Sequence, residues 1–312
     1  MQVPPPTSYI RVNDLRCPDG TGIGVGSKRG DGPSAARSDL TEIGASWEIA
    51  ATVIDALAKA GLHSATDEGP RRWTPVKETE RILSRRPVRP PGSWQHAHDD
   101  EVLVWHGSFN HGGYGCDVPV VKARGLVRAS PRELLDLLLD SGRVREYNKM
   151  SLGRRDEHHF VRWGEDGRKG EAKIVRSLTK PSVIRKPIEM LLLLHARRLD
   201  GDSDAVATGA GGGQVRGYLV VTRSVWERES LAPLSRDQKA ANANEKAIRS
   251  EMLLGVNLIQ KLEGQPDCCE LTTITHLSSL YMPLMIAKKI GLTVSWIYRR
   301  SHLFGVALSF VL

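Results

Sequence analysis

The sequence is poor in cysteine and has none of the cysteine spacings that mark a disulfide-rich or metal-bound fold. Four cysteines stand in 312 residues, and no two of them form a C-x-x-C pair. This count argues against a disulfide scaffold and against a zinc module. Cys268 and Cys269 are adjacent on an expected strand, so their side chains should point to opposite faces. These features are typical of a reduced, intracellular protein.

We expect neither a secretory signal nor a membrane-spanning segment in this sequence. Residues 1–6, MQVPPP, provide neither a basic start nor an apolar region of the kind a signal peptide needs. The most membrane-like stretch, residues 290–312, contains Arg299 and Arg300. Each arginine would cost about 2.5–3.5 kcal/mol at the centre of a bilayer. We therefore expect a cytoplasmic protein that does not cross a membrane.

Familiar catalytic and metal-binding motifs are absent from the sequence. It contains no G-x-S-x-G or H-E-x-x-H motif, and the glycines between residues 20 and 30 have the spacing of neither a dinucleotide loop nor a phosphate loop. His96, His98, Asp99 and Asp100 stand together, but no further ligand follows at helical spacing, which favours polar surface residues over a metal site. We predict no catalytic residues, no metal and no cofactor.

The charge balance is basic. Lysine and arginine exceed aspartate and glutamate by 44 to 36, a net charge of +8, and the pI is near 9.4. Such a surface attracts phosphate groups, either in nucleic acid or in an anionic membrane. The excess is moderate and spread along the chain, so we expect no nucleic-acid partner.

Apolar periodicity and caps predict a mixed α and β organisation in which antiparallel strands dominate. Residues 1–40 are rich in proline, glycine and serine and are expected to be disordered. The helices are predicted at residues 47–62 with Gly61 as a stop, at residues 75–84 with Thr74 as cap, and after Ser130, which forms a capping box with Glu133. The strands are predicted at residues 101–105, 118–127, 158–163, 171–178, 190–198, 218–225, 254–262 and 268–277.

A long amphipathic helix is predicted to follow the last strand. Pro283 stands where a helix begins, and apolar residues recur at helical spacing through Met282, Met285, Ile286, Ile290, Val294 and Ile297. Antiparallel strands that close onto a final helix can form a curved sheet with a helix across its mouth, which can enclose a ligand. The same apolar stripe is also what simple core packing requires, and the sequence leaves both possibilities open.

Several segments stand in the order of one family's motifs. Residues 121–133 are similar to a strand that runs into an "SP-x-E" helix, and Tyr147 and Asn148 follow that helix. Residues 222–225 are similar to an "SRSV" strand, and residues 271–283 to the passage into a final helix. Together these segments resemble the START domain, the lipid-transfer module related to steroidogenic acute regulatory protein, in which a tryptophan and an aspartate stand where this sequence has Tyr147 and Asn148. The resemblance covers residues 75–302. It implies an α+β helix-grip fold, a curved antiparallel sheet wrapped around a long C-terminal helix that encloses one lipid.

One departure from the family pattern bears on the ligand. The family often carries an "RDFV" strand with a buried arginine a few residues later; here Ile188 and Leu194 stand at these positions. The resemblance then implies a cavity without that cationic anchor, which makes an anionic headgroup a poorer match. Leu191 to Leu194 form a run of four leucines, so both faces of this strand are predicted to be apolar.

The resulting prediction is lipid binding and transfer through an internal apolar cavity, with the C-terminal helix as lid. The predicted lining residues are Leu192, Leu194, Tyr218, Val220, Met282, Ile286 and Ile290. The predicted membrane-facing basic residues are Lys288, Lys289, Arg299 and Arg300. The expected partners are a sterol, phospholipid or acyl lipid and, transiently, an anionic membrane surface. The predicted divisions are residues 1–40 (disordered tail), 41–74 (helical lead-in), 75–302 (lipid-binding domain) and 303–312 (apolar tail).

Two alternatives from other classes remain open. The first is an enzyme on the same helix-grip scaffold, similar to a cyclase or a hydrolase, which requires ionisable side chains that converge in the cavity. Glu171, Arg176 and His276 are the candidates for such a group. The second is a lipid-free interaction scaffold in which large side chains fill the cavity.

Overall fold

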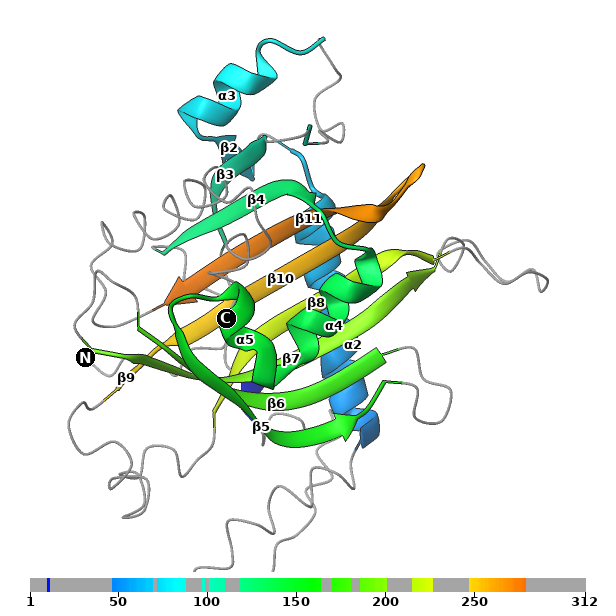
Figure 1. The fold of residues 1–312 in the computed structure, drawn as a ribbon. Coiled ribbons are helices and arrows are strands. Elements are labelled where there is room, and N and C mark those ends of the chain that lie inside the picture. The colour runs from blue at the N-terminus through cyan, green and yellow to red at the C-terminus, as the bar shows by residue number, and fades with distance from the viewer. Residues whose placement is uncertain are drawn as a thin grey trace, which may run out of the picture.

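The computed structural model describes residues 10–11, 47–69, 72–87, 97–98, 101–109, 118–163, 170–180, 186–200, 215–226 and 247–278. Its centre is an open antiparallel sheet in the order β2-β3-β4-β11-β10-β8-β7-β6-β5 (Figure 1). The strands are β2 (Trp73–Pro75), β3 (Val102–Ser108), β4 (Pro119–Val127), β5 (Ser151–Val161), β6 (Gly170–Thr179), β7 (Ile188–Asp200), β8 (Val215–Trp226), β10 (Glu251–Leu262) and β11 (Gln265–Ser278). Two short strands, β1 (Ile10–Arg11) and β9 (Ile248–Arg249), pair in parallel with β8 and β7.

Helices lie on both faces of this sheet. They are α2 (Trp47–Thr66), α3 (Lys77–Leu83), α4 (Pro131–Leu139), the 3-10 turn η2 (Ser141–Arg143) and α5 (Val144–Tyr147). Figure 1 shows α2 crossing behind the sheet, whereas α4 and α5 lie in front of it. Both α2 and α4 contact β8, β10 and β11. We call the two surfaces of the sheet the α2 face and the α4 face.

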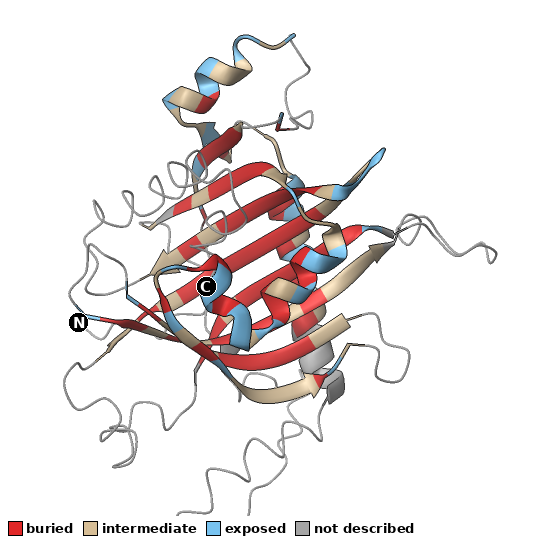
Figure 2. Cartoon of the chain, viewed as in Figure 1, coloured by how far each residue is buried: buried red, intermediate tan, exposed pale blue. Residues whose placement is uncertain are grey.

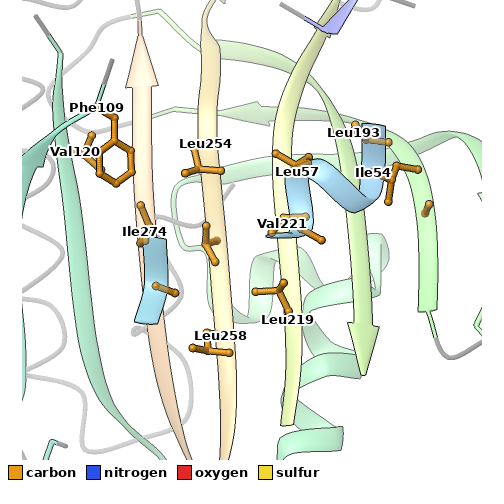
Figure 3. Packing of buried hydrophobic residues seen from close by; sticks show 14 of the residues in the cluster. Ile54, Leu57, Phe109, Val120, Leu193, Leu219, Val221, Leu254, Leu258 and Ile274 are labelled. Atoms are coloured by element: carbon orange, nitrogen blue, oxygen red, sulfur yellow. The ribbon is translucent and has the colours of Figure 1, made fainter. Parts of the chain in front are cut away.

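Side-chain alternation assigns each strand residue to one of these faces. On β7, Leu193 packs in the cluster on the α2 face, whereas Leu192 and Leu194 pack in the cluster on the α4 face. Ile54 and Leu57 of α2 belong to the first of these clusters (Figure 3). The prediction of a strand that is apolar on both faces is confirmed. Figure 2 shows the buried residues concentrated along the central strands.

The predicted capping box is present at the start of α4. The Ser130 hydroxyl accepts a hydrogen bond from the Glu133 amide, and the Glu133 carboxylate accepts one from the Ser130 amide. Two amides at the helix N-terminus that would otherwise lack partners are thereby satisfied. Leu134, Leu135, Leu138 and Leu139 then point toward the sheet and are buried.

Two local predictions are wrong. Gly61 does not end the first helix, which continues to Thr66. A Cβ at Gly61 would lie 2.6 Å from Val221 Cγ1, so glycine serves the close approach of α2 to the sheet. The second helix begins at Lys77 rather than at Pro75, because Trp73–Pro75 pairs with β3. Proline is acceptable there because β2 is an edge strand.

The predicted terminal helix lies outside the described residues, as do Met282, Ile286, Ile290, Lys288, Lys289, Arg299 and Arg300. The described sheet and helices match the predicted helix-grip α+β class. Among the described helices, none is long and apolar enough to span a bilayer.

Candidate functional site

The α4 face carries all the predicted lining residues that the structure describes. Leu192 and Leu194 are fully buried, and Tyr218 and Val220 are 8% and 2% exposed. All four belong to one apolar cluster together with the leucines of α4. Leu194 stands opposite Thr222 on the neighbouring strand, and Val220 stands opposite Ala196. The strand alternation used in the sequence prediction therefore places these residues on a common face.

Two buried cations fix α4 to the edge of this face. Arg154 of β5 donates to the Leu138 carbonyl at 2.8 Å and to the Tyr147 hydroxyl at 3.0 Å. Lys173 of β6 donates to the Leu139 carbonyl at 2.7 Å. Helix C-terminal carbonyls lack partners within their own helix and attract cations. The C-terminal end of α4 is thus tied to β5 and β6.

The Lys173 ammonium has no spare donor for an anionic ligand. Besides the Leu139 carbonyl, the Lys173 ammonium contacts Asp156 Oδ2 at 3.1 Å and Glu171 Oε1 at 3.0 Å. An ammonium has three donors, and these three acceptors use them. Burial alone would raise the pKa of Asp156, but the Ser141 hydrogen bond and the Lys173 charge lower it. Burial also raises the pKa of Tyr147.

Sequence reasoning did not find these cations. The family comparison, which placed Leu194 where an arginine is usual, pointed to a cavity without a cationic anchor. Leu194 is indeed apolar and buried, but Arg154 and Lys173 are buried on the same face from two other strands. Their partners in α4 and α5 lie 7 to 34 residues away along the chain, so no local sequence pattern predicts the burial.

Polar side chains also stand in the middle of the α4 face. Thr222 of β8 and Asn257 of β10 are 1% and 2% exposed. Thr222 lies opposite Gly255, and Asn257 lies opposite Val220 on one side and Thr273 on the other. These residues were not singled out from the sequence as ligand contacts, although each interrupts an otherwise apolar strand.

A second buried group of charges lies on the α2 face, next to the end of α2. Glu68 Oε1 is 2.6 Å from Arg124 Nη2 and 3.6 Å from Lys122 Nζ. Lys122 Nζ also donates to the Asp67 carbonyl at 2.7 Å and lies over the rings of Trp73 and Trp105. Burial, and then the neighbouring arginine, lowers the pKa of Lys122 to about 8. This cluster joins the segment after α2 to β4.

The three residues suggested for an enzyme do not meet. Glu171 is paired with Lys173, and Arg176 is held by Glu157 at 2.7 Å and by Glu189 at 3.3 Å. His276 is on β11, which is separated from β6 by three strands of the sheet. Its ring makes an edge contact with Phe109, in the cluster on the α2 face. The three side chains therefore cannot act on one substrate atom in this arrangement.

Within the described residues, no group of three or more histidine, cysteine, aspartate or glutamate side chains is placed to hold a metal ion. Of the four clustered residues considered from the sequence, His98 is described, and His96, Asp99 and Asp100 are outside the described ranges. Cys268 is partly exposed and Cys269 is buried, as expected for neighbours on opposite faces of a strand.

No family model matches the sequence, and no curated protein matches it. Solved structures do match. Human StAR-related lipid transfer protein 5 is 13% identical, with 80% of this chain and 92% of that chain covered and a TM-score of 0.54. The human StarD13 (DLC2) lipid transfer and protein localization domain is 14% identical, with 71% and 91% covered and a TM-score of 0.44. The di-domain ARO/CYC BexL from the BE-7585A biosynthetic pathway is 9% identical, with 57% and 41% covered and a TM-score of 0.28.

At these identities the similarity establishes the fold alone. The match to human StAR-related lipid transfer protein 5 covers most of both chains. The fold predicted from the sequence, that of the START domain, is confirmed for the described sheet and helices.

Proposed function

We propose that this protein binds a lipid against the α4 face and carries it between membranes. The observation that supports this most directly is the set of buried apolar residues on that face, which includes Leu192, Leu194, Tyr218 and Val220. In this proposal the lipid lies against these residues, and the C-terminal segment covers it. The fold shared with a StAR-related lipid transfer protein supports the same proposal.

The energetics of transfer favour an apolar face that is closed off from water. Burial contributes about 0.8 kcal/mol per methylene, so a site that takes up a whole acyl chain competes with the bilayer interior. The barrier to transfer is then the contact of the lipid with water during exit. Docking on a membrane lowers this barrier because the lipid passes directly between two apolar surroundings.

The finer parts of the proposal concern the C-terminal segment. Met282, Ile286 and Ile290 would complete the lipid site as one face of a terminal helix, which acts as the lid. Lys288, Lys289, Arg299 and Arg300 would meet anionic headgroups, each contributing about 1 kcal/mol near the membrane surface. The net charge of +8 supports an anionic membrane as the transient partner.

Neighbouring leucines on β7 offer a direct test. Leu193 and Leu194 are 4% and 0% exposed, but they face opposite sides of the sheet. A tryptophan at Leu193 adds volume to the core beneath α2, which typically costs about 1–3 kcal/mol. A tryptophan at Leu194 would occupy lipid space, so Leu194→Trp should be destabilised less and should lose bound lipid.

The experiment compares the full chain and these two variants after incubation with vesicles of phosphatidylcholine, phosphatidylserine, sterol and diacylglycerol. Native mass spectrometry measures the bound lipid, and urea unfolding measures stability. Wild type and Leu193→Trp should retain lipid, whereas Leu194→Trp should not. If Leu194→Trp is destabilised as much as Leu193→Trp and wild type carries no lipid, the α4 face is a packed core, and the lipid-free scaffold is correct.

A further inference from the structure

Thr222 and Asn257 present polar atoms in the middle of the apolar α4 face. Thr222 Oγ1 and Asn257 Oδ1 are both buried and have no hydrogen-bond partner among the described residues. Burial of such an atom without a partner is unfavourable, and most buried polar groups in proteins are paired. A valine at Thr222 would have almost the same shape and would avoid the penalty.

The sheet brings these two residues close together. Thr222 is directly opposite Gly255, and Asn257 is two residues further along the same strand. Side chains in this diagonal relation on adjacent antiparallel strands are roughly 7–8 Å apart. One small polar group placed between them is therefore within reach of both.

Gly255 provides the space for the Thr222 hydroxyl. A Cβ built on Gly255 would lie 2.1 Å from Thr222 Oγ1, well inside van der Waals contact. Any other residue at this position would displace the hydroxyl. The glycine thus keeps a polar atom in place on a strand where glycine is otherwise unfavourable.

Charged residues are absent from the described part of this patch. Between Tyr218 and Ser224, between Gly255 and Ile259, and between Cys269 and Leu277, the residues that alternate onto the α4 face are uncharged. The buried cations of this face, Arg154 and Lys173, stand on β5 and β6 and are held by protein acceptors. The partly buried Arg198 of β7 stands opposite Tyr218, four residues from the Leu194 that faces Thr222. A neutral ligand group suits the patch, because an anion there would lack a counter-charge.

We propose that Thr222 and Asn257 form a polar subsite that binds the hydroxyl group of an uncharged lipid. This inference rests on the proposed lipid-binding function and specifies its ligand class. The ligand hydroxyl donates a hydrogen bond to Asn257 Oδ1 and accepts one from the Thr222 hydroxyl. A hydroxyl has both capacities, whereas an ether oxygen only accepts and cannot satisfy the Asn257 acceptor.

Three probes with one 16-carbon tail and different heads test the subsite: hexadecan-1-ol, its methyl ether and hexadecyl phosphate. Each competes with a fluorescent fatty probe for the full-length protein. Hexadecan-1-ol should bind at least about tenfold more tightly than the ether, because the ether leaves a buried acceptor unpaired. Hexadecan-1-ol should also bind more tightly than hexadecyl phosphate, because the phosphate brings a charge into the patch.

Variants separate the subsite from general effects on the face. Asn257→Leu should remove most of the preference for the alcohol over the ether, because it removes the acceptor that the ether leaves unpaired. Thr222→Val should weaken the binding of alcohol and ether alike, because both accept a hydrogen bond from the Thr222 hydroxyl. Ser177→Ala is the matched control, because Ser177 Oγ is another buried atom of the α4 face that has no hydrogen-bond partner among the described residues. Ser177 pairs with Met190, four residues from the Leu194 that stands opposite Thr222. This control should leave the preference intact.

Stability supplies a second measurement. Thr222→Val removes an unpaired buried hydroxyl, so the ligand-free variant should melt no lower than wild type even though it binds the alcohol more weakly. Equal affinity for alcohol and ether in wild type, a preference unchanged in Asn257→Leu, or alcohol binding unchanged in Thr222→Val would overturn the subsite while lipid binding stands. Failure of all three probes to bind would instead overturn the proposed function.

Discussion

Glu68 is predicted to be essential for the stability of the α2 face. Its carboxylate compensates two cations that are almost fully buried, Arg124 at 0% and Lys122 at 1% side-chain exposure. Glu68 itself is 5% exposed. Glu68→Gln retains the size and shape of the side chain but removes its charge. Two buried cations then lose their shared counter-charge.

The distances set the size of the effect. At 2.6 and 3.6 Å, the two attractions are worth about 6 and about 5 kcal/mol at an effective dielectric constant of about 20. In the intact cluster, the cost of removing the charges from water offsets much of this attraction. In Glu68→Gln the two cations remain buried, but the attraction that compensated their desolvation is lost. Glu270 also acts on Arg124, and the Asp67 carbonyl still holds Lys122. We expect Glu68→Gln to lower the free energy of unfolding by about 3–5 kcal/mol.

Urea unfolding followed by far-UV circular dichroism measures this loss at neutral pH. Asp136→Asn is the control, because Asp136 pairs with Arg132 on the surface and both side chains are 49% exposed. That exposed pair should contribute about 0–1 kcal/mol. A loss below about 1 kcal/mol for Glu68→Gln, similar to the control, would refute the reasoning, since the cations would then be compensated by other groups.

Two further predictions concern charge. The folded protein releases the Lys122 proton near pH 8, whereas the unfolded chain keeps it until about pH 10.5, so raising the pH through this window favours the folded state. The unfolding free energy of wild type should therefore rise relative to Lys122→Met, by at most about 1.4 kcal/mol per pH unit, and a flat difference would contradict the buried ammonium. Co-sedimentation with phosphatidylserine vesicles should weaken with salt and should fall when glutamine replaces the four C-terminal basic residues Lys288, Lys289, Arg299 and Arg300. Binding that is unchanged in this variant would assign the four charges to ordinary surface.

Local sequence signals predicted much of the architecture. The capping box at Ser130 depends on residues three positions apart, and the alternation along β7, β8 and β10 depends on residues two positions apart. Interactions between residues so close in sequence can be predicted without knowledge of the fold. They also placed Leu192, Leu194, Tyr218 and Val220 correctly on a common face.

Features that depend on distant partners were not predicted. Arg124 is buried because Glu68, 56 residues earlier, returns to it after α2. Gly61 continues a helix because Val221 approaches it from the sheet. In each case the local signal, a charged residue or a glycine, has a commoner meaning as surface or as a helix end. Packing between segments overrides it.

Thr222 and Asn257 belong to an intermediate case. Thr222 alternates with Val220 and Asn257 alternates with Ile259, so the sequence alone places both polar residues on the α4 face. What the sequence lacks is the information that their polar atoms have no partner among the described residues, which depends on all neighbours within hydrogen-bond distance. A polar residue at an inward position of a buried strand is therefore a signal for a ligand contact only once the surrounding packing is known.

The two faces of the sheet differ more in what covers them than in their apolar content. Leu193 and Leu194 are adjacent and equally apolar, yet Leu193 packs in a cluster that is shared with α2. The segment after α2 is joined to the sheet by the ion pairs of Glu68 with Lys122 and Arg124. Movement of α2 away from the sheet would therefore break these buried ion pairs. Among the described residues of the other face, the buried cations Arg154 and Lys173 fix the C-terminal end of α4, at the β5 and β6 edge. A ligand that enters and leaves requires a face whose cover is not fastened by buried charges along its whole length. This asymmetry favours the α4 face as the lipid site, and it makes Glu68→Gln a probe of stability rather than of lipid binding.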